Sequence, residues 1–306
     1  MPDHEREARV VAGYDGSDRA RQAVSWAAGE AEGRRAGLTV VEVVDWPVTG
    51  TLPPAGGSLP PAGTLVDEQT LRGHAERRLA DLAQDVRQAR SDLDVETRVE
   101  FGRAAEALPR VAGPTDLVVI GSSGRTALPR MLLGSTAAEL VHTCDRPIVV
   151  VREAEDVPTR DGRVVVGVDG SNISARAIGF AFDFAARRGC ELVAVHAWSD
   201  LPMDGLEPVR VWDEDLAQVR RDGEQLLADS LSGGRQRHPE VVVRTVVTFD
   251  RPGHALVEQA EGAVLLVVGS HGRGAMRSVL LGSVSHAVIY HAPCPVAVVR
   301  GQPEHD

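Results

Sequence analysis

The sequence contains no lysine, so all 33 of its basic residues are arginine. This absence excludes every mechanism that needs a lysine amine, including the phosphate lysine of a Walker A loop, the kinase strand lysine and Schiff-base chemistry. The net charge of −11 argues against a nucleic-acid partner, which normally requires a basic surface. If the protein holds a nucleotide, it does so by a device other than lysine.

Cysteines and long apolar runs are also scarce. Cys144, Cys190 and Cys294 are far apart and form no CxxC pair, which indicates neither a disulfide framework nor a zinc site, and we expect them to be small core residues. No apolar run approaches the roughly 20 residues that span a bilayer. The charged start, MPDHEREARV, has no signal-peptide core. We therefore expect a globular cytoplasmic protein with no membrane partner.

What the chain does contain is a repeat of itself. The stretch RVVAGYDGSDRARQAVSWAA from Arg9 matches RVVVGVDGSNISARAIGFAF from Arg163, and GSSGRTALPRMLLGS from Gly121 returns as GSHGRGAMRSVLLGS from Gly269. The first half carries a net insertion, for which PVTGTLPPAGGSLPPAG is the candidate, and EAEDVPTRDG reads as a polar linker. This pattern predicts a tandem duplication with domains at residues 1–152 and 160–306.

Each half alternates strand and helix patterns. In the first half VVAGY, LTVVEVV, VETRVEF, DLVVI and PIVVV read as strands, because they are short and rich in β-branched residues. Several are apolar almost throughout, which is typical of a parallel sheet buried on both faces. Helical patterns cover 17–35, 65–90, a short segment after Gly102, and 135–144. The predicted fold class is α/β, with two tandem doubly wound five-stranded parallel sheets of the Rossmann type.

The repeated glycine loop falls where such folds bind ligands, beyond the carboxyl ends of the strands. Gly121 ends a strand, Gly124 follows in the loop, and Gly134 and Ser135 open the next helix. Glycine lets the backbone approach a bulky group, and a helix N-terminus, which Ser135 can cap, offers N–H groups to an anion. The alternative is that these residues only form turns, because duplication copies turns as well as sites.

Asp-Gly-Ser after the first strand, followed by G-x2-G-x9-G-[ST] after the fourth, resembles the ATP-binding branch of the universal stress protein family over nearly the whole chain. The resemblance implies the strand order 3-2-1-4-5, with ATP across the ends of strands one and four. In that order PIVVVR and PVAVVR would be exposed edges that need a partner. Pairing them within the chain would give a pseudo-dimer of the two halves, as the family's homodimers do between chains. A further homodimer through the amphipathic helix at 71–88 is a second option, against ordinary packing of that helix on its own sheet.

The resemblance also assigns nucleotide-binding residues to both halves. An aspartate would contact the adenosine side, a residue of the second strand would contact adenine through its backbone, and the glycine loop and the following helix would hold the phosphates. The aspartate has a local alternative, because Asp-Gly-Ser can simply turn and cap a helix. The assigned residues are Asp15, Val43, Gly121, Gly124, Arg125, Gly134, Ser135 and Thr136, and in the second half Asp169, Ala197, Gly269, Gly272, Arg273, Gly282, Ser283 and Val284.

The halves differ after the third strand, where Gly102 of the first half is replaced by Asp250. A carboxylate near a polyphosphate is unfavourable unless a metal or an arginine offsets it, so we expect the second site to be the weaker one. His271 replaces Ser123, and it is either a phosphate-sensing or proton-transferring group or a solvated loop histidine.

Catalytic motifs are absent: the sequence has no G-x-S-x-G elbow, no H-E-x-x-H and no kinase catalytic loop. We therefore expect an ATP-binding stress-response protein that acts as a regulatory or signalling module and is not an efficient enzyme. One alternative is a weak ATPase, with Mg²⁺ from solution, or a nucleotide-dependent transferase of the adenine nucleotide α-hydrolase-like type. Another is an interaction protein with vestigial pockets.

Overall fold

The computed structural model describes residues 8–45, 67–124, 133–152, 162–198, 213–272 and 281–300. The predicted insertion at 47–63 lies outside the described residues, as do Arg125, Arg273 and all but the last residue of the linker at 153–162.

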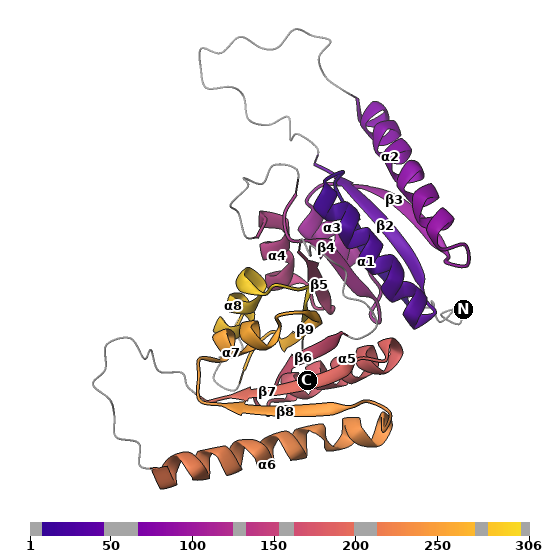
Figure 1. Ribbon diagram of the computed structural model, residues 1–306. Helices are drawn as coiled ribbons and strands as arrows, with labels where there is room; N and C mark the ends of the chain where they lie inside the picture. The colour runs from indigo at the N-terminus through magenta and orange to yellow at the C-terminus, as the bar shows by residue number, and fades with distance from the viewer. Residues whose placement is uncertain are drawn as a thin grey trace, which may run out of the picture.

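Both halves have the predicted alternation of strands and helices (Figure 1). The first half consists of β1 (Arg9–Tyr14), α1 (Asp18–Arg34), β2 (Gly37–Val44), α2 (Glu68–Ala89), β3 (Val95–Phe101), α3 (Ala104–Val111), β4 (Leu117–Gly121), α4 (Ser135–Thr143) and β5 (Ile148–Val151). The second consists of β6 (Arg163–Gly167), α5 (Asn172–Arg188), β7 (Glu191–Ala197), α6 (Asp213–Arg237), β8 (Val243–Thr248), α7 (Pro252–Gln259), β9 (Ala263–Gly269), α8 (Ser283–His291) and β10 (Val296–Val299).

The ten strands form one continuous sheet in the order β3-β2-β1-β4-β5-β10-β9-β6-β7-β8. Within each half the strands are parallel, in the predicted order 3-2-1-4-5. The two sheets are not separate, because β5 and β10 pair antiparallel, with Val149 opposite Ala297. The edge strands β5 and β10 therefore supply each other's backbone hydrogen-bond partners, and the prediction of a pseudo-dimer within one chain is confirmed. Figure 1 shows the halves meeting at β5, with α2 and α6 at opposite ends of the molecule.

Helices cover both faces of the sheet. Core residues of α1, α2, α5 and α6 pack together on one face, and those of α3, α4, α7 and α8 on the other. The amphipathic stripe of α2 buries Leu79, Leu82 and Ala83 against its own half, which accounts for its pattern without a second copy of the chain. All three cysteines are buried, and burial raises the pKa of each thiol, as expected for core residues. In the described part of the chain, no helix is long and apolar enough to cross a membrane.

The halves are also joined by side chains on both faces of the sheet. On one face Trp26 of α1 stacks on Phe184 of α5, with ring centroids 6.1 Å apart. On the other face Arg152, which follows β5, donates to the carbonyl oxygen of Ile289 in α8 at 2.7 Å. Arg300, which follows β10, donates to the carbonyl oxygen of Val141 in α4, also at 2.7 Å. Each half thus supplies an arginine to the C-terminal end of the other half's last helix, where carbonyls lack intrahelical partners.

Candidate functional site

Each half has a cavity at the carboxyl ends of its strands, with a volume of about 500 Å³ in the first half and about 810 Å³ in the second. The structure brings together the assigned residues that it describes. The first cavity is lined, among others, by Asp15, Val43, Gly121, Gly124, Gly134, Ser135 and Thr136, and the second by Asp169, Ala197, Gly269, Gly272, Gly282, Ser283 and Val284. Arg125 and Arg273 are not described, so their assignment stays a prediction.

The aspartate that follows the first strand of each half uses its two oxygens differently. Oδ1 of Asp15 accepts a hydrogen bond from the amide of Ser17 at 3.0 Å, and the Ser17 hydroxyl caps α1. Oδ2 faces the glycine loop, because a Cβ on Gly124 would lie 2.5 Å from it. The local-turn explanation of Asp-Gly-Ser is therefore confirmed through Oδ1, whereas Oδ2 lies beside the glycine loop in the cavity wall and its contact with a ligand stays a prediction.

The second half repeats this arrangement. Oδ1 of Asp169 accepts from the Ser171 amide at 2.9 Å, and a Cβ on Gly272 would lie 2.8 Å from Oδ2. In both halves the intervening glycine has a positive φ, 86° at Gly16 and 77° at Gly170, a conformation that favours glycine. The turn therefore fixes the carboxylate in the cavity wall, beside the glycine loop.

The helix N-termini at the cavities differ from expectation in one respect. Ser135 does not cap α4, because it is the first helical residue and Gly134 occupies the N-cap position. The same holds for Ser283 and Gly282 at α8. Because glycine has no side chain, it cannot accept a hydrogen bond from the first helical amides, as Ser17 does in α1. These termini are therefore better suited to an anion than serine-capped ends.

The loop glycines also serve the packing of the loop itself. A Cβ on Gly121 would lie 3.1 Å from the backbone carbonyl carbon of Arg19, and one on Gly134 would lie 3.1 Å from Cα of Ser123. In the second half a Cβ on Gly269 would lie 2.8 Å from Cγ2 of Ile173. The turn alternative is thus part of the explanation, since the close packing of loop, strand and helix is what shapes the cavity wall.

The polar side chains around the two cavities differ. In the first half Arg19 donates to the hydroxyl of Ser123, while Ala20 and Ala137 line the cavity. In the second half serines stand at the two positions that match these alanines. They are Ser174, whose hydroxyl accepts from the Asp169 amide at 3.2 Å, and Ser285, whose hydroxyl donates to the Gly269 carbonyl at 2.6 Å.

Two histidines line the second cavity. Nδ1 of His271 lies 3.0 Å from the Ser270 hydroxyl, so this histidine is part of the cavity wall rather than a purely solvated loop residue. His196 is buried, with Nδ1 2.7 Å from the Val168 carbonyl oxygen. The matching residue of the first half is Glu42, which is paired with Arg78 outside the cavity. The second cavity therefore contains two imidazole groups, whereas no histidine is among the described residues that line the first.

Two aromatic residues of the second cavity were missed from the sequence. Trp198 and Phe249 line it although their side chains are 47% and 46% exposed. They directly follow β7 and β8, so their position just beyond two strand ends was the available signal. The matching Phe101 of the first half lies beneath the guanidinium of Arg72, 4.7 Å from the ring centroid. Tyr14 also lines the first cavity but is buried, so among the described residues an aromatic mouth, meaning exposed rings that line a cavity, is present in the second half only.

Asp250 was expected to lie close to bound phosphates, but it does not line the second cavity. Its neighbours Phe249 and Pro252 line the cavity, but Asp250 is not among the described lining residues. Its carboxylate instead pairs with His254, with Oδ2 2.6 Å from Nδ1, and this hydrogen bond lowers the pKa of Asp250. The expected repulsion between this carboxylate and bound phosphates is therefore not supported by the geometry.

Comparison with known proteins agrees with this architecture of two Rossmann-like halves. The universal stress protein family model matches residues 8–152 and again residues 162–300. Universal stress protein Rv2005c of Mycobacterium tuberculosis is 40% identical over 294 residues, which cover 95% of this chain and 96% of that protein. A universal stress protein of Mycolicibacterium smegmatis is 38% identical over 296 residues, with coverage of 95% and 96%. The chain belongs to the universal stress protein family, as a tandem member.

A solved universal stress protein from Archaeoglobus fulgidus has a similar structure, with a TM-score of 0.66 over 95% of this chain and 98% of that one. Its sequence is 20% identical, so this similarity concerns the fold.

Proposed function

We propose that the protein binds one adenine nucleotide in each half, with ATP as the ligand, and acts as a nucleotide-dependent regulatory module in the response to stress. The observation that carries this proposal is the convergence of every assigned residue that the structure describes on one of two cavities. These residues come from four separate parts of each half, and only the fold brings them together.

The chemistry of the cavities supports a phosphorylated ligand. The glycine-capped starts of α4 and α8 face cavities whose walls are glycine and serine, and backbone N–H groups at a helix start bind anions without any lysine. Asp15 and Asp169 line the same cavities, where a carboxylate can accept hydrogen bonds from ribose hydroxyls. A nucleotide offers both kinds of group, phosphate oxygens and ribose hydroxyls.

A binding role fits these cavities better than efficient catalysis. Among the described lining residues the carboxylates are Asp15 and Asp169, and Oδ1 of each is held by a backbone amide. The buried His196 is likewise held by a backbone carbonyl. General base catalysis needs a group within hydrogen-bond reach of the proton that it takes, whereas Oδ1 of each aspartate and Nδ1 of both His196 and His271 already have partners within the protein. Mg²⁺ would enter with the ATP rather than through a dedicated set of protein ligands.

The test is to denature the freshly purified full chain, identify any released nucleotide by mass spectrometry and measure its molar ratio. Two ATP molecules per chain would support occupancy of both halves. If AMP or a cyclic nucleotide is the main nucleotide released, the proposed sites stand but ATP is not their ligand. Absence of bound nucleotide, together with no thermal stabilisation by added MgATP, would refute the proposal and leave an interaction protein with vestigial pockets.

A turnover assay separates the binding role from the enzymatic alternative. We expect ATP to remain intact over many binding lifetimes. Hydrolysis well above background that is lost in Asp15→Asn or Asp169→Asn would show a weak ATPase instead, because both variants keep the size of the side chain and remove its charge.

A further inference from the structure

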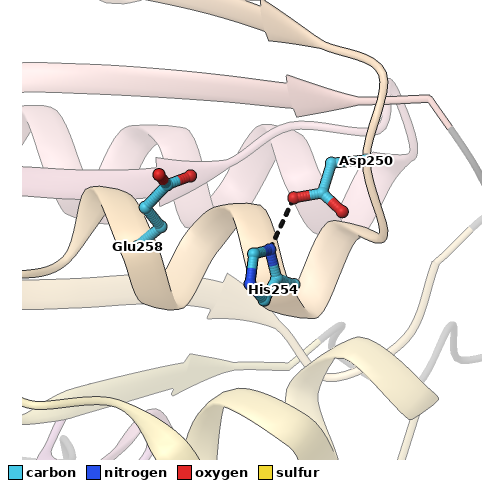
Figure 2. A group of neighbouring side chains, drawn as sticks. All are labelled: Asp250, His254 and Glu258. Atoms are coloured by element: carbon cyan, nitrogen blue, oxygen red, sulfur yellow. Dashed lines mark hydrogen bonds and ion pairs between the residues drawn. The ribbon is translucent and has the colours of Figure 1, made fainter.

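Three side chains that could act as metal ligands gather at the start of α7, and among the described residues of the chain no second group of this kind is found. Asp250, His254 and Glu258 each present one ligand atom, and these three atoms lie within 4.8 Å of one another. Figure 2 shows Asp250 and His254 facing each other, with Glu258 one turn further along the same helix.

The local sequence explains why these side chains converge. His254 and Glu258 are four residues apart on α7, so they share one face of the helix. Asp250 comes from the turn before the helix, where its Oδ1 accepts a hydrogen bond from the Arg251 amide at 2.6 Å. This bond orients the carboxylate, whose Oδ2 lies 2.6 Å from Nδ1 of His254. Two of the three donors are therefore already in contact.

The cluster is separate from the second cavity, although it is built on the same segment. Phe249, Pro252 and Leu256 line the cavity, whereas His254 and Glu258 are exposed on α7 and the half-buried Asp250, which precedes the helix, is not a lining residue. Binding at the cluster can therefore be tested without reference to a nucleotide.

The distances suit a small divalent ion. An ion placed among three atoms that are at most 4.8 Å apart need lie no more than about 2.8 Å from any of them, and zinc bonds to nitrogen and oxygen are about 2.0–2.2 Å long. The exposed side chains of His254 and Glu258 can close that difference by small rotations. One imidazole nitrogen with two carboxylate oxygens suits Zn²⁺, Co²⁺ or Ni²⁺, whereas Mg²⁺ and Ca²⁺ prefer oxygen ligands alone.

We propose that Asp250, His254 and Glu258 bind one divalent ion of the zinc class, with its remaining coordination positions open to solvent. The ion would bridge the β8–α7 turn to the first turns of α7. It would thereby fix the segment that carries Phe249 and Pro252 into the neighbouring cavity.

The first half provides a comparison within the same molecule. The positions that match Asp250, His254 and Glu258 are Gly102, Glu106 and Arg110, so two of the three donors are missing there. Glu106 pairs instead with Arg103, at 3.4 Å. The duplication therefore did not simply copy this cluster, and a single ion per chain is expected.

The test is a titration of the full chain with Co²⁺, followed by its visible absorption, at mildly alkaline pH. Alkaline conditions are chosen because the hydrogen bond to Asp250 raises the pKa of His254, and a bound ion must displace that proton. We expect saturation at one equivalent, competition by Zn²⁺, and no thiolate charge-transfer band, since all three cysteines are buried.

Variants identify the ligands. His254→Ala and Glu258→Gln change exposed side chains, and each should weaken binding by at least roughly tenfold, the loss seen even for outer partners of metal ligands. The matched control is His238→Ala. His238 also touches two carboxylates, but Asp183 contacts Nε2 and Glu240 contacts Nδ1, so the two carboxylates meet opposite sides of the ring and cannot share one ion with it. This control should leave Co²⁺ binding unchanged.

Two results would overturn the proposal. One is the lack of any saturable spectral change with the wild-type chain, and the other is binding that His254→Ala and Glu258→Gln leave intact. Circular dichroism of each variant checks that the fold is retained. None of these outcomes depends on nucleotide binding, so failure here and failure of the proposed function are distinguishable.

Discussion

The two halves share one fold and one motif, yet their cavities are chemically different. The first, of about 500 Å³, is lined by alanines at positions where the second, of about 810 Å³, has Ser174 and Ser285. The second also has Trp198 and Phe249 at its mouth. Both halves keep the glycine loop, the helix N-terminus and the aspartate that line each cavity, which together we call the cradle. The side chains around the cradle have diverged. The cradle is suited to phosphate groups, which all nucleotides share, and the diverged side chains are suited to differences in affinity or in the ligand that is bound.

The cradle itself is where the halves should behave alike, and breaking it should have the largest effect. A Cβ at Gly124 or Gly272 would push the Asp15 or Asp169 carboxylate out of place, while the backbone around it can stay. We expect Gly124→Ala to weaken nucleotide binding in the first half roughly a hundredfold, about 2.7 kcal/mol, and Gly272→Ala to do so in the second. Calorimetry should then find one tight site in each single variant and none in the double variant.

The control for these variants is Gly33→Ala, in α1, where nothing lies within 4 Å of the added methyl group. It should leave both sites intact and stabilise the helix by about 0.5–1 kcal/mol. Two tight sites remaining in the double variant would show that the aspartates do not act in binding.

Arg152 and Arg300, which each bind a helix end of the opposite half, should contribute equally to the free energy of unfolding. Arg152→Met and Arg300→Met each remove a charged donor from a helix end in the other half, so we expect each to lower the free energy of unfolding by about 1.5–3 kcal/mol. Chemical denaturation measures the loss. Arg220→Met is the control, since its ion pair with Glu224 is exposed and should contribute less than about 1 kcal/mol. A large loss for only one of the two arginines would show that the halves are not joined symmetrically.

The aromatic mouth, formed by Trp198 and Phe249, should make nucleotide binding in the second cavity differ from binding in the first. In a Gly124→Ala background, where only the second cavity binds tightly, we expect Trp198→Ala to weaken nucleotide binding about tenfold through loss of ring stacking. Trp198→Phe should retain most of the affinity. Quenching of Trp198 fluorescence by ATP, lost in both Trp198 variants, would locate the nucleotide. Unchanged affinity in Trp198→Ala would place adenine elsewhere.

The smallest effect is expected at Asp250, in buffer with Mg²⁺ as its sole divalent ion. Because the carboxylate is paired with His254 and does not line the cavity, Asp250→Asn should change ATP affinity in the second cavity less than about twofold. A marked gain in affinity, measured by calorimetry in the Gly124→Ala background, would instead restore the expectation that this charge repels the phosphates.

Much of the fold follows from local sequence. The five apolar β-branched segments of each half became five strands, and the helix starts at Ser17 and Ser171 follow from side-chain caps that a sequence displays. The repeat and its glycine spacing identified the family and the residues that gather at each cavity. These features are readable because they depend on neighbours along the chain.

The tertiary structure decided what depends on residues far apart in the chain. Pairing of β5 with β10 merged two sheets into one, and it placed Arg152 and Arg300 on helices of the opposite half. Packing made Gly134 rather than Ser135 the helix cap, turned Asp250 away from the cavity toward His254, and brought Trp198 and Phe249 to its mouth. The direction of a side chain at a strand end is set by what packs around it, and a sequence pattern carries the position but not that direction.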